Sequence, residues 1–242
     1  MENKDKLSWI FFDIGNVLMD ETPWLNYYTE LIYRTLSSAG FLQSRERYDG
    51  EIARILSEER GEISQLWHLF VPDEGKREAL RLSIREENLW AYYELTGPLA
   101  GIPETLRDLA ADFQLGIIAN QQKGAHRWLE KNQLQPYFQV CALDCDLGVA
   151  KPDRRHFEWA LKEAGCRPKE AMMIGDRLDY DIEPAKALGM STIRLRACGD
   201  YRRREVRSES ERPDVELYHA IEIAPAVRRL ASLPATPLIP IN

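Results

Sequence analysis

Residues 7–16, with the sequence LSWIFFDIGN, decide the fold of this chain. The stretch begins with apolar and aromatic residues, which is typical of a buried strand, and this run stops at Asp13. A carboxylate directly behind a buried strand is costly unless a cation, a lysine or backbone N–H groups stabilise it. The pattern therefore predicts a first strand that carries Asp13 into a site. A helix or turn cap is the alternative, and Gly15 and Asn16 would also suit it.

Four later segments have the same strand-like character: Gln114–Ala119, Gln139–Leu143, Ala171–Gly175 and Ser191–Leu195. Helical spacing of apolar residues lies between them, in Pro103–Ala111, Gly124–Asn132, Arg155–Ala164 and Ile182–Leu188. Strands that alternate with helices through short loops predict an α/β fold. We expect a doubly wound, Rossmann-like parallel sheet with helices on both faces.

One region departs from this alternation. From Thr22 to about Leu95 only helical patterning is found, and Thr22-Pro23 is a typical helix start. The chain rejoins the alternating pattern at Thr96-Gly97-Pro98. We expect an all-helical cap domain over residues 20–96, inserted into an α/β core domain made of residues 1–19 and 97–242.

Composition limits the partners of the protein. The 242 residues carry a formal net charge of −7, which argues against an extended nucleic-acid surface because such a surface needs clustered positive charge. Met1–Lys6 is charged, and Asp13 and Asn16 interrupt the apolar run from Trp9 to Met19. This is neither a signal peptide nor a membrane span, so we expect a cytoplasmic protein without a membrane partner. Both a monomer and a homodimer remain open.

Polar side chains follow several of the predicted strands. Asp13, Asn120 and Asp176 each come directly after a strand, and such strand ends share one crevice in a doubly wound sheet. Asp176 and Asp181 belong to the segment GDRLDYD, whose carboxylates would suit Mg²⁺. A solvated acidic turn that caps the next helix is an equally good interpretation of that segment alone. Lys151, just before Pro-Asp, could reach a phosphate as a point charge.

Together these residues carry a more specific signal. Their order and local contexts resemble the haloacid dehalogenase-like (HAD) superfamily, whose four motifs are recognisable as FFDIGNVL, GIIANQ, GVAKPD and MIGDRLDYD. The resemblance covers nearly all of the chain. It includes the helical insert, which looks like the family's cap between motifs one and two. The first motif is similar to the Asp-x-Gly-Asn variant subgroup.

The resemblance implies a magnesium site. Mg²⁺ would be held by the carboxylate of Asp13, the backbone carbonyl of Gly15 and the carboxylate of Asp176, with Asp181 as outer support. The implied substrate is a small phosphorylated metabolite.

The resemblance also implies the catalytic roles. Asp13 would be the nucleophile that forms an aspartyl-phosphate, Lys151 would steady Asp13 and the phosphate, and Asn120 would contact the transferring group. The expected activity is that of a magnesium-dependent hydrolase of small phosphate monoesters. Hydrolysis of carbon–halogen bonds is disfavoured by the acidic GDRLDYD segment, and a phosphoacceptor signalling domain is disfavoured because Asp13 follows the first strand.

Two positions depart from the phosphatase pattern. Gly15 stands where a second aspartate usually acts as general acid and base, and loss of such assistance costs about two to four orders of magnitude in rate. Ala119 stands where a Ser or Thr hydroxyl usually contacts phosphate. The alternative function is therefore a catalytically weak or inactive phosphate-binding or regulatory protein. As a hypothesis, Asp20 or Glu21 supplies the missing proton, although both also fit a surface hinge.

Overall fold

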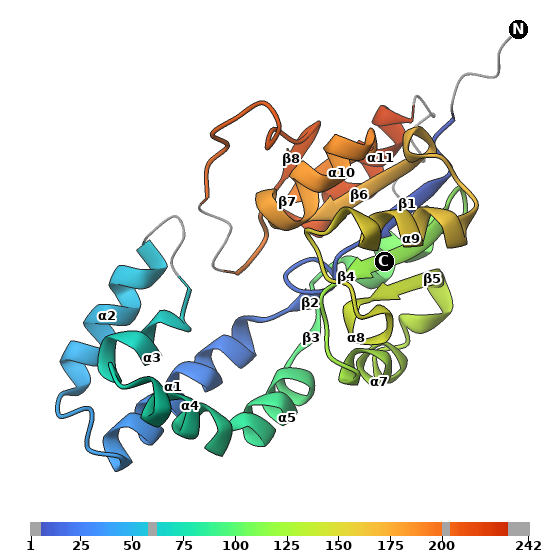
Figure 1. Cartoon of the computed structure of the whole chain (residues 1–242). Coiled ribbons are helices and arrows are strands. Elements are labelled where there is room, and N and C mark those ends of the chain that lie inside the picture. The colour runs from blue at the N-terminus through green and yellow to red at the C-terminus, as the bar shows by residue number, and fades with distance from the viewer. Residues whose placement is uncertain (1–5, 58–61, 200–203, 232–242) are drawn as a thin grey trace, which may run out of the picture. The chain divides into compact units, whose positions relative to one another are not determined.

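The computed structural model describes residues 6–57, 62–199 and 204–231 (Figure 1). The chain divides into two compact units. The α/β unit comprises Met1–Met19, Pro98–Ala197 and Val206–Asn242, and the helical unit comprises Asp20–Gly97 together with Cys198–Glu205.

The α/β unit is built on a six-stranded sheet in the order β5-β4-β1-β6-β7-β8. The paired strands all run parallel. The strands are β1 (Trp9–Phe12), β4 (Gln114–Ala119), β5 (Phe138–Leu143), β6 (Ala171–Gly175), β7 (Ser191–Leu195) and β8 (Val215–Leu217). The predicted α/β class is thereby confirmed. Because β1 lies between β4 and β6, the strand order turns at the centre of the sheet, which is where ligands bind in such folds.

Helices alternate with these strands. They are α6 (Ile102–Leu109), α7 (Gly124–Lys131), α8 (Asp144–Leu147), α9 (Arg154–Ala164), α10 (Glu183–Leu188) and α11 (Ile223–Leu230). One buried cluster joins Phe11 of β1 and Met173 of β6 to Phe157 of α9 and Ala185 of α10. Successive residues of a strand point to opposite faces, so this cluster marks the face that α9 and α10 cover. In Figure 1 both helices are drawn in front of the sheet.

Close packing at the sheet centre explains one glycine. Gly116 of β4 pairs with Phe11 of β1, and a Cβ placed on Gly116 would lie 2.6 Å from the Phe11 ring. A side chain at this position would force the aromatic ring out of its place, since buried cores have no free volume of that size.

The helical unit contains α1 (Thr22–Ser38), α2 (Arg45–Ser57), α3 (Gln65–Phe70), α4 (Glu74–Ser83) and α5 (Arg85–Leu95). Its core includes Ile32, Leu36, Tyr48 and Trp67, all of which are almost fully buried. The sequence pattern predicts one helical stripe over residues 79–93, whereas the structure divides this region at Ile84. That residue has φ −108° and ψ 3°, outside the helical range, and its side chain is buried.

The chain passes between the two units through a two-stranded sheet. This sheet pairs β2 (Met19–Asp20) with β3 (Gly97–Pro98). Just beyond it, the N–H of Leu99 donates to the carbonyl of Leu18 over 2.8 Å. The two ends of the inserted segment are therefore fastened to each other.

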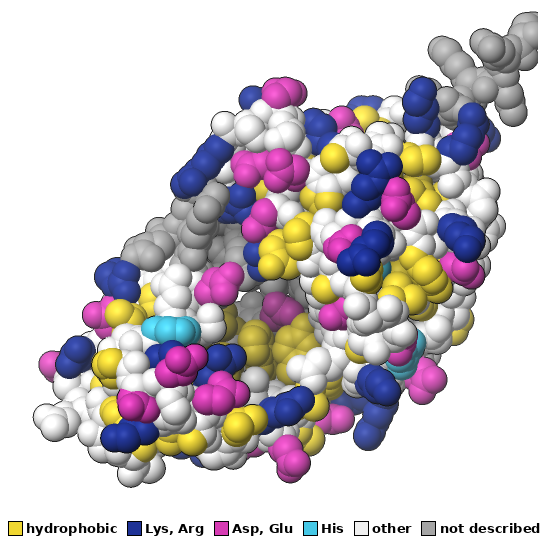
Figure 2. Space-filling model, viewed as in Figure 1, with side chains coloured by type: hydrophobic (Ala, Val, Ile, Leu, Met, Phe, Trp, Pro, Cys, Tyr) yellow, Lys and Arg dark blue, Asp and Glu magenta, His cyan; other side chains and the backbone are white. Residues whose placement is uncertain are grey.

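The surface carries charges of both signs. The sequence contains 32 basic and 39 acidic residues, and Figure 2 shows both kinds interspersed over the visible face of the α/β unit. Within the described ranges, no helix has the length and apolar composition needed to cross a membrane.

Candidate active site

Three neighbouring strands deliver the polar residues of the site. β1 ends just before Asp13, β4 just before Asn120 and β6 just before Asp176. The N–H of Asp13 donates to the carbonyl of Ile174 over 2.9 Å, which continues the pairing of β1 with β6. The strand ends therefore bring these three residues to the same edge of the sheet, as the sequence analysis expected.

Lys151 stands between two carboxylates. Its Nζ lies 2.8 Å from Oδ1 of Asp13 and 2.6 Å from Oδ1 of Asp181. The Lys151 side chain is 2% exposed, that of Asp181 is fully buried, and that of Asp13 is 13% exposed. Asp13 is thus the member of the trio with access to a ligand.

The charge of Lys151 is stabilised by these neighbours. Burial opposes that charge, but the attraction of Asp13 and Asp181 and their hydrogen bonds outweigh it, so the pKa of Lys151 lies above its ordinary value. Lys151 is accordingly an ammonium group at neutral pH, able to attract a phosphate.

Asn120 holds the backbone of Lys151. The Nδ2 of Asn120 donates to the Lys151 carbonyl over 2.9 Å, and its Oδ1 accepts from the Lys151 N–H over 2.7 Å. Both the nitrogen and the oxygen of the Asn120 amide thus fix the loop at Lys151, which lies 31 positions further along the sequence. A positioning role for Asn120 follows from these bonds. Its predicted contact with the transferring group would use the second N–H of the amide and stays a prediction.

The acidic residues form a compact triad. Asp13, Asp176 and Asp181 each offer a carboxylate oxygen, and these three oxygens lie within 4.8 Å of one another. Oδ2 of Asp181 accepts from the N–H of Arg177 over 3.0 Å, while its Oδ1 contacts Lys151. Both oxygens of Asp181 are therefore engaged, which fits the outer support assigned to it rather than a direct ligand.

The charge of the cluster suits a divalent cation. Asp13, Asp176 and Asp181 contribute three negative charges and Lys151 one positive charge, which leaves two negative charges in a mostly buried place. Buried carboxylates at this density are stabilised by a hard cation, and carboxylate oxygen is the ligand type that Mg²⁺ and Ca²⁺ prefer. The residues present therefore fit a divalent metal.

Gly175 allows Asp181 to approach the strand end. A Cβ placed on Gly175 would lie 2.3 Å from the Cβ of Asp181, so no other residue fits there without a shift. The turn between them contains the π-helix η3 (Leu178–Ile182), which directs Asp181 back toward β6.

The loop after Asp13 is tightly folded. Three successive N–H groups, those of Val17, Leu18 and Met19, donate to the carbonyl of Ile14. Asn16 adopts a left-handed φ of 54°, a conformation that Asn tolerates better than most residues. This fold fixes the backbone around Gly15, the predicted source of a carbonyl ligand, and that role stays a prediction.

Sequence reasoning missed Arg194. This arginine of β7 is fully buried, its Nε donates to the backbone carbonyl of Asp176 over 3.2 Å, and its Nη1 pairs with Glu216 of β8 over 3.0 Å. A guanidinium group thus anchors the backbone of an acidic site residue. The available signal was an arginine between the apolar residues Ile193 and Leu195 of the predicted strand STIRL.

A second contact fixes the loop after β4. Asp144, at the start of α8, accepts from the N–H of Gln121 over 2.5 Å. This places a carboxylate against the loop that follows Asn120, where it shapes the backbone.

Asp20 and Glu21, the candidates for a proton donor, make local contacts in the helical unit. Oδ1 of Asp20 accepts from the N–H of Thr22 over 2.9 Å at the start of α1. The hydroxyl of Tyr92 donates to Glu21. These contacts match the alternative in which both residues are structural, and the proton-donor hypothesis stays untested.

Comparison with known proteins agrees with this geometry. Residues 10–195 match the model of the haloacid dehalogenase-like hydrolase family. The chain belongs to the haloacid dehalogenase-like hydrolases. The matched range includes Asp13, Asn120, Lys151, Asp176 and Asp181, so the family assignment and the site described above rest on the same part of the chain.

Several known proteins are similar to the chain. A glyceraldehyde 3-phosphate phosphatase of Methanopyrus kandleri is 33% identical over 132 residues, which spans 54% of this chain and 56% of the relative. The enzyme of the same name from Methanothermobacter thermautotrophicus is 25% identical over 77% of this chain and 84% of its own length. A HAD phosphatase structure from Thermococcus onnurineus superposes with a TM-score of 0.66 at 24% identity, covering 91% of this chain and 98% of that chain. This last likeness concerns the fold.

Proposed function

We propose that this haloacid dehalogenase-like hydrolase is a magnesium-dependent phosphatase of small phosphate monoesters, with Asp13 as its covalent nucleophile. The observation that carries the proposal is the placement of Lys151 between Asp13 and Asp181, with Asp176 completing the acidic triad. A nucleophilic carboxylate, a fixed ammonium group and a divalent-cation site are the groups that phosphoryl transfer to a carboxylate needs.

The metal would be held by Asp13, Asp176 and the backbone carbonyl of Gly15, with Asp181 supporting them through Lys151 and the Arg177 N–H. When bound, a divalent cation neutralises the charge of the phosphate and of the attacking carboxylate. The carbonyl of Asp176 is fixed by Arg194, so the ligand of the metal would be oriented by a buried guanidinium group.

In the first step an oxygen of Asp13 attacks phosphorus. The P–O bond to the substrate alcohol breaks, its electron pair leaves with the alcohol oxygen, and the new acyl-phosphate lies on Asp13. Lys151 holds Oδ1 of Asp13, so the carboxylate has one orientation and its other oxygen is available for the attack. The ammonium group of Lys151 also attracts the oxygens of the transferring phosphoryl group.

In the second step water attacks the phosphoryl group. The bond from phosphorus to the Asp13 oxygen breaks, which returns the carboxylate and yields inorganic phosphate. The leaving alcohol oxygen of the first step takes up a proton, and the attacking water gives one up. Gly15 cannot mediate either transfer, so solvent or another acid must do so.

The names of the relatives support a phosphate ester as substrate. Two relatives described above are glyceraldehyde 3-phosphate phosphatases, and a pyrimidine 5'-nucleotidase of Escherichia coli is 30% identical over 47% of this chain. These substrates are all small phosphorylated metabolites. The match to the Methanopyrus enzyme spans about half of each chain, so the proposal names the substrate class and no single compound.

Gly15 and Ala119 favour a second candidate, a phosphate-binding or regulatory protein with slow turnover. Ala119 is fully buried at the end of β4, where it offers no hydroxyl to phosphate. Loss of one hydrogen bond to a charged group costs about 1.5–3 kcal/mol. Such a loss would slow the reaction while leaving Asp13, Lys151 and the acidic triad able to bind phosphate.

Hydrolysis of p-nitrophenyl phosphate separates the two candidates. For the phosphatase we expect turnover with magnesium, loss of turnover with excess EDTA and recovery on re-addition of the metal. The Asp13→Asn variant should lose at least about three orders of magnitude in kcat. Asp153→Asn is the matched control, because the Asp153 carboxylate contacts only Arg155 in the described structure, where it caps α9 through the Arg155 N–H and pairs with its guanidinium group. Phosphate binding without magnesium-dependent turnover in the wild type would establish the second candidate instead.

A further inference from the structure

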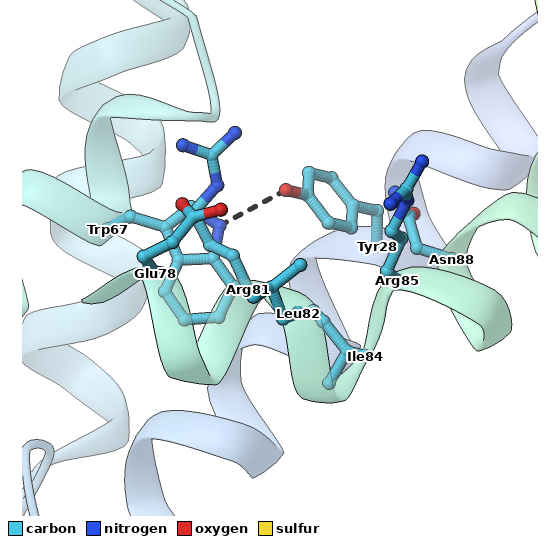
Figure 3. Close-up of a pocket in the computed structure, with 8 residues that line it drawn as sticks. All are labelled: Tyr28, Trp67, Glu78, Arg81, Leu82, Ile84, Arg85 and Asn88. Atoms are coloured by element: carbon cyan, nitrogen blue, oxygen red, sulfur yellow. Dashed lines mark hydrogen bonds between the residues drawn. The ribbon is translucent and has the colours of Figure 1, made fainter. Parts of the chain in front are cut away.

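The helical unit contains a pocket of its own. It has a volume of about 250 Å³ and lies between α1, α3, α4 and the start of α5 (Figure 3). Ligand sites of small molecules typically begin at about 300 Å³, so this space suits a compact metabolite. Its wall includes the almost fully buried indole of Trp67 and the buried side chain of Ile84.

Hydrogen bonds from two tryptophans determine which polar groups of this pocket remain available to a ligand. The Nε1–H of Trp67 donates to the hydroxyl oxygen of Tyr28 over 3.1 Å, as the dashed line in Figure 3 marks. The Nε1–H of Trp24 donates to Oδ1 of Asn88 over 2.9 Å. Because these bonds use acceptor atoms of Tyr28 and Asn88, the hydroxyl proton and the amide NH₂ remain as donors. Both residues line the pocket.

Two arginines add positive charge to these donors. Arg81 lies in the last turn of α4, and Arg85 is the first residue of α5. Figure 3 shows both guanidinium groups extending to the same side in this view, with the Tyr28 ring between them. Neither arginine forms an ion pair within the described ranges, although Glu78 also lines the pocket.

The position of Arg85 has a cost for the helix. A cation at a helix N-terminus is unfavourable because the helix dipole places partial positive charge there. Arg81, by contrast, lies in the last turn of α4, where the helix dipole favours a cation. The helix α5 therefore gains nothing from Arg85, whereas an anion beside this guanidinium group would relieve the penalty.

We infer that this pocket binds a small organic dianion. The two guanidinium groups, the Tyr28 hydroxyl and the Asn88 amide would donate to its charged oxygens, and the indole of Trp67 would contact its apolar body. Guanidinium groups suit carboxylate and phosphate alike, because they present paired N–H donors to paired oxygens. A dicarboxylate and a phosphate ester thus share the required chemistry.

The anion could come from two sources. It could be the non-reacting part of a substrate, in which case the inference rests on the proposed function, or it could be a separate effector. Binding of the dianion itself does not require hydrolysis at Asp13, so its test is independent of the proposed activity.

The binding test uses succinate and the full chain labelled with ¹⁵N-tryptophan. Succinate carries two carboxylates and no phosphorus. The indole N–H resonance of Trp67, identified by its loss in Trp67→Phe, should shift saturably as succinate is added. The resonance of Trp128, which is buried in the α/β unit, should not follow the same curve. A Trp67 resonance that never saturates would overturn the inference.

Matched variants test the two arginines. In the double variant Arg81→Gln/Arg85→Gln, succinate should bind at least about tenfold more weakly, because charge-assisted hydrogen bonds are lost. Lys76→Gln removes a positive charge from the same helix α4 at an exposed position outside the pocket and should leave the affinity unchanged. Circular dichroism checks that each variant is folded. Equal weakening in both, or no weakening in the double variant, would contradict the inference.

A kinetic arm distinguishes the two sources of the anion. If the pocket holds part of the substrate, succinate should compete with p-nitrophenyl phosphate or a larger phosphate ester, and the double variant should raise KM for the larger ester. If it holds an effector, succinate should change kcat or leave both constants unchanged while the Trp67 resonance still shifts. Absence of any turnover would count against the proposed function alone, since the Trp67 titration would still report binding.

Discussion

The Cα of Gly175 lies directly against the side chain of Asp181, so closely that a Cβ on Gly175 would be 2.3 Å from the Cβ and Cγ of Asp181. Asp181 is fully buried and holds the ammonium group of Lys151. The strand end and the ion pair therefore depend on the absence of a side chain at one position.

This contact predicts the effect of Gly175→Ala. The added methyl group must displace Asp181, so we expect a loss of about 1–3 kcal/mol in the free energy of unfolding. Turnover should fall with it, because Lys151 loses a partner. Urea unfolding and hydrolysis of p-nitrophenyl phosphate measure the two effects. Gly50→Ala is the control: Gly50 lies inside α2 with nothing within 4 Å of its Cβ position, and alanine should stabilise that helix. Normal stability and activity of Gly175→Ala would contradict the packing described here.

Asn120 is expected to matter through the backbone of Lys151. In Asn120→Ala the Lys151 N–H and carbonyl lose their partners, which should cost about 1–3 kcal/mol of stability. Misplacement of Lys151 should lower kcat/KM by about 10²-fold. Asn120→Asp keeps an acceptor for the N–H and should be less destabilised than Asn120→Ala. Asn132→Ala, which removes one bond to the Trp128 carbonyl, is the matched control and should leave kcat/KM unchanged.

Arg194 is expected to tune metal binding. Arg194→Met removes the donor that holds the carbonyl of Asp176, and loss of such a supporting contact typically weakens a metal site about 10–100-fold. Isothermal titration with magnesium measures the affinity without any substrate. Arg196→Met is the control, because Arg196 pairs with the same Glu216 over 3.3 Å and lies on the chain just beyond β7. An equal loss of affinity in both variants would assign the effect to Glu216 instead of Asp176.

His156 should make the fold sensitive to acid. This residue of α9 is fully buried, and Nε2 lies 3.0 Å from the carbonyl of Ala142. Burial lowers the pKa of His156 below its ordinary value of 6.5, so folding favours the neutral ring. Unfolding exposes the ring, which then takes up a proton below about pH 6.5. Its contribution is therefore fully present above pH 6.5 and declines as the pH falls below that value.

Urea unfolding at pH 7.5 and pH 5.5 tests this dependence. The loss of stability on acidification should be smaller in His156→Gln than in the wild type. His68→Gln, at an exposed position on α3, is the control for the removal of a histidine. On acidification its free energy of unfolding should fall by as much as that of the wild type. A His156→Gln variant with an unchanged pH dependence would show that other groups cause it.

Much of the α/β unit could be predicted from local sequence. β4, β6 and β7 have the predicted bounds, because an apolar strand in a parallel sheet is buried on both faces and leaves a continuous apolar run. β8 was missed, since Val215–Leu217 is three residues long and contains Glu216, which gives no such run. The helix α11 was not expected either. Ile84 ends α4 through its backbone conformation, for which its side chain gives no signal.

The site was predictable to the extent that its residues stand in local motifs. Asp13, Lys151, Asp176 and Asp181 follow strand ends or turns whose positions the sequence sets, and the structure brings them together. The two hydrogen bonds between the Asn120 side chain and Lys151 were not predictable, because they use backbone atoms of a residue 31 positions away. The Arg194 contact likewise depends on the pairing of β6 with β7, which fixes how a buried side chain meets the next strand end.

The two-stranded sheet of β2 and β3 has a consequence for how this protein could change in evolution. Its two strands are neighbours, so everything between Asp20 and Gly97 leaves and re-enters the α/β unit at one spot. A segment attached in this way can be lengthened, shortened or exchanged while the sheet keeps its order, since the join needs only two adjacent chain ends. Lys151 and its carboxylate partners all belong to the α/β unit, so such a replacement would leave the reactive groups in their present positions. The architecture thus lets one scaffold acquire new inserts by grafting.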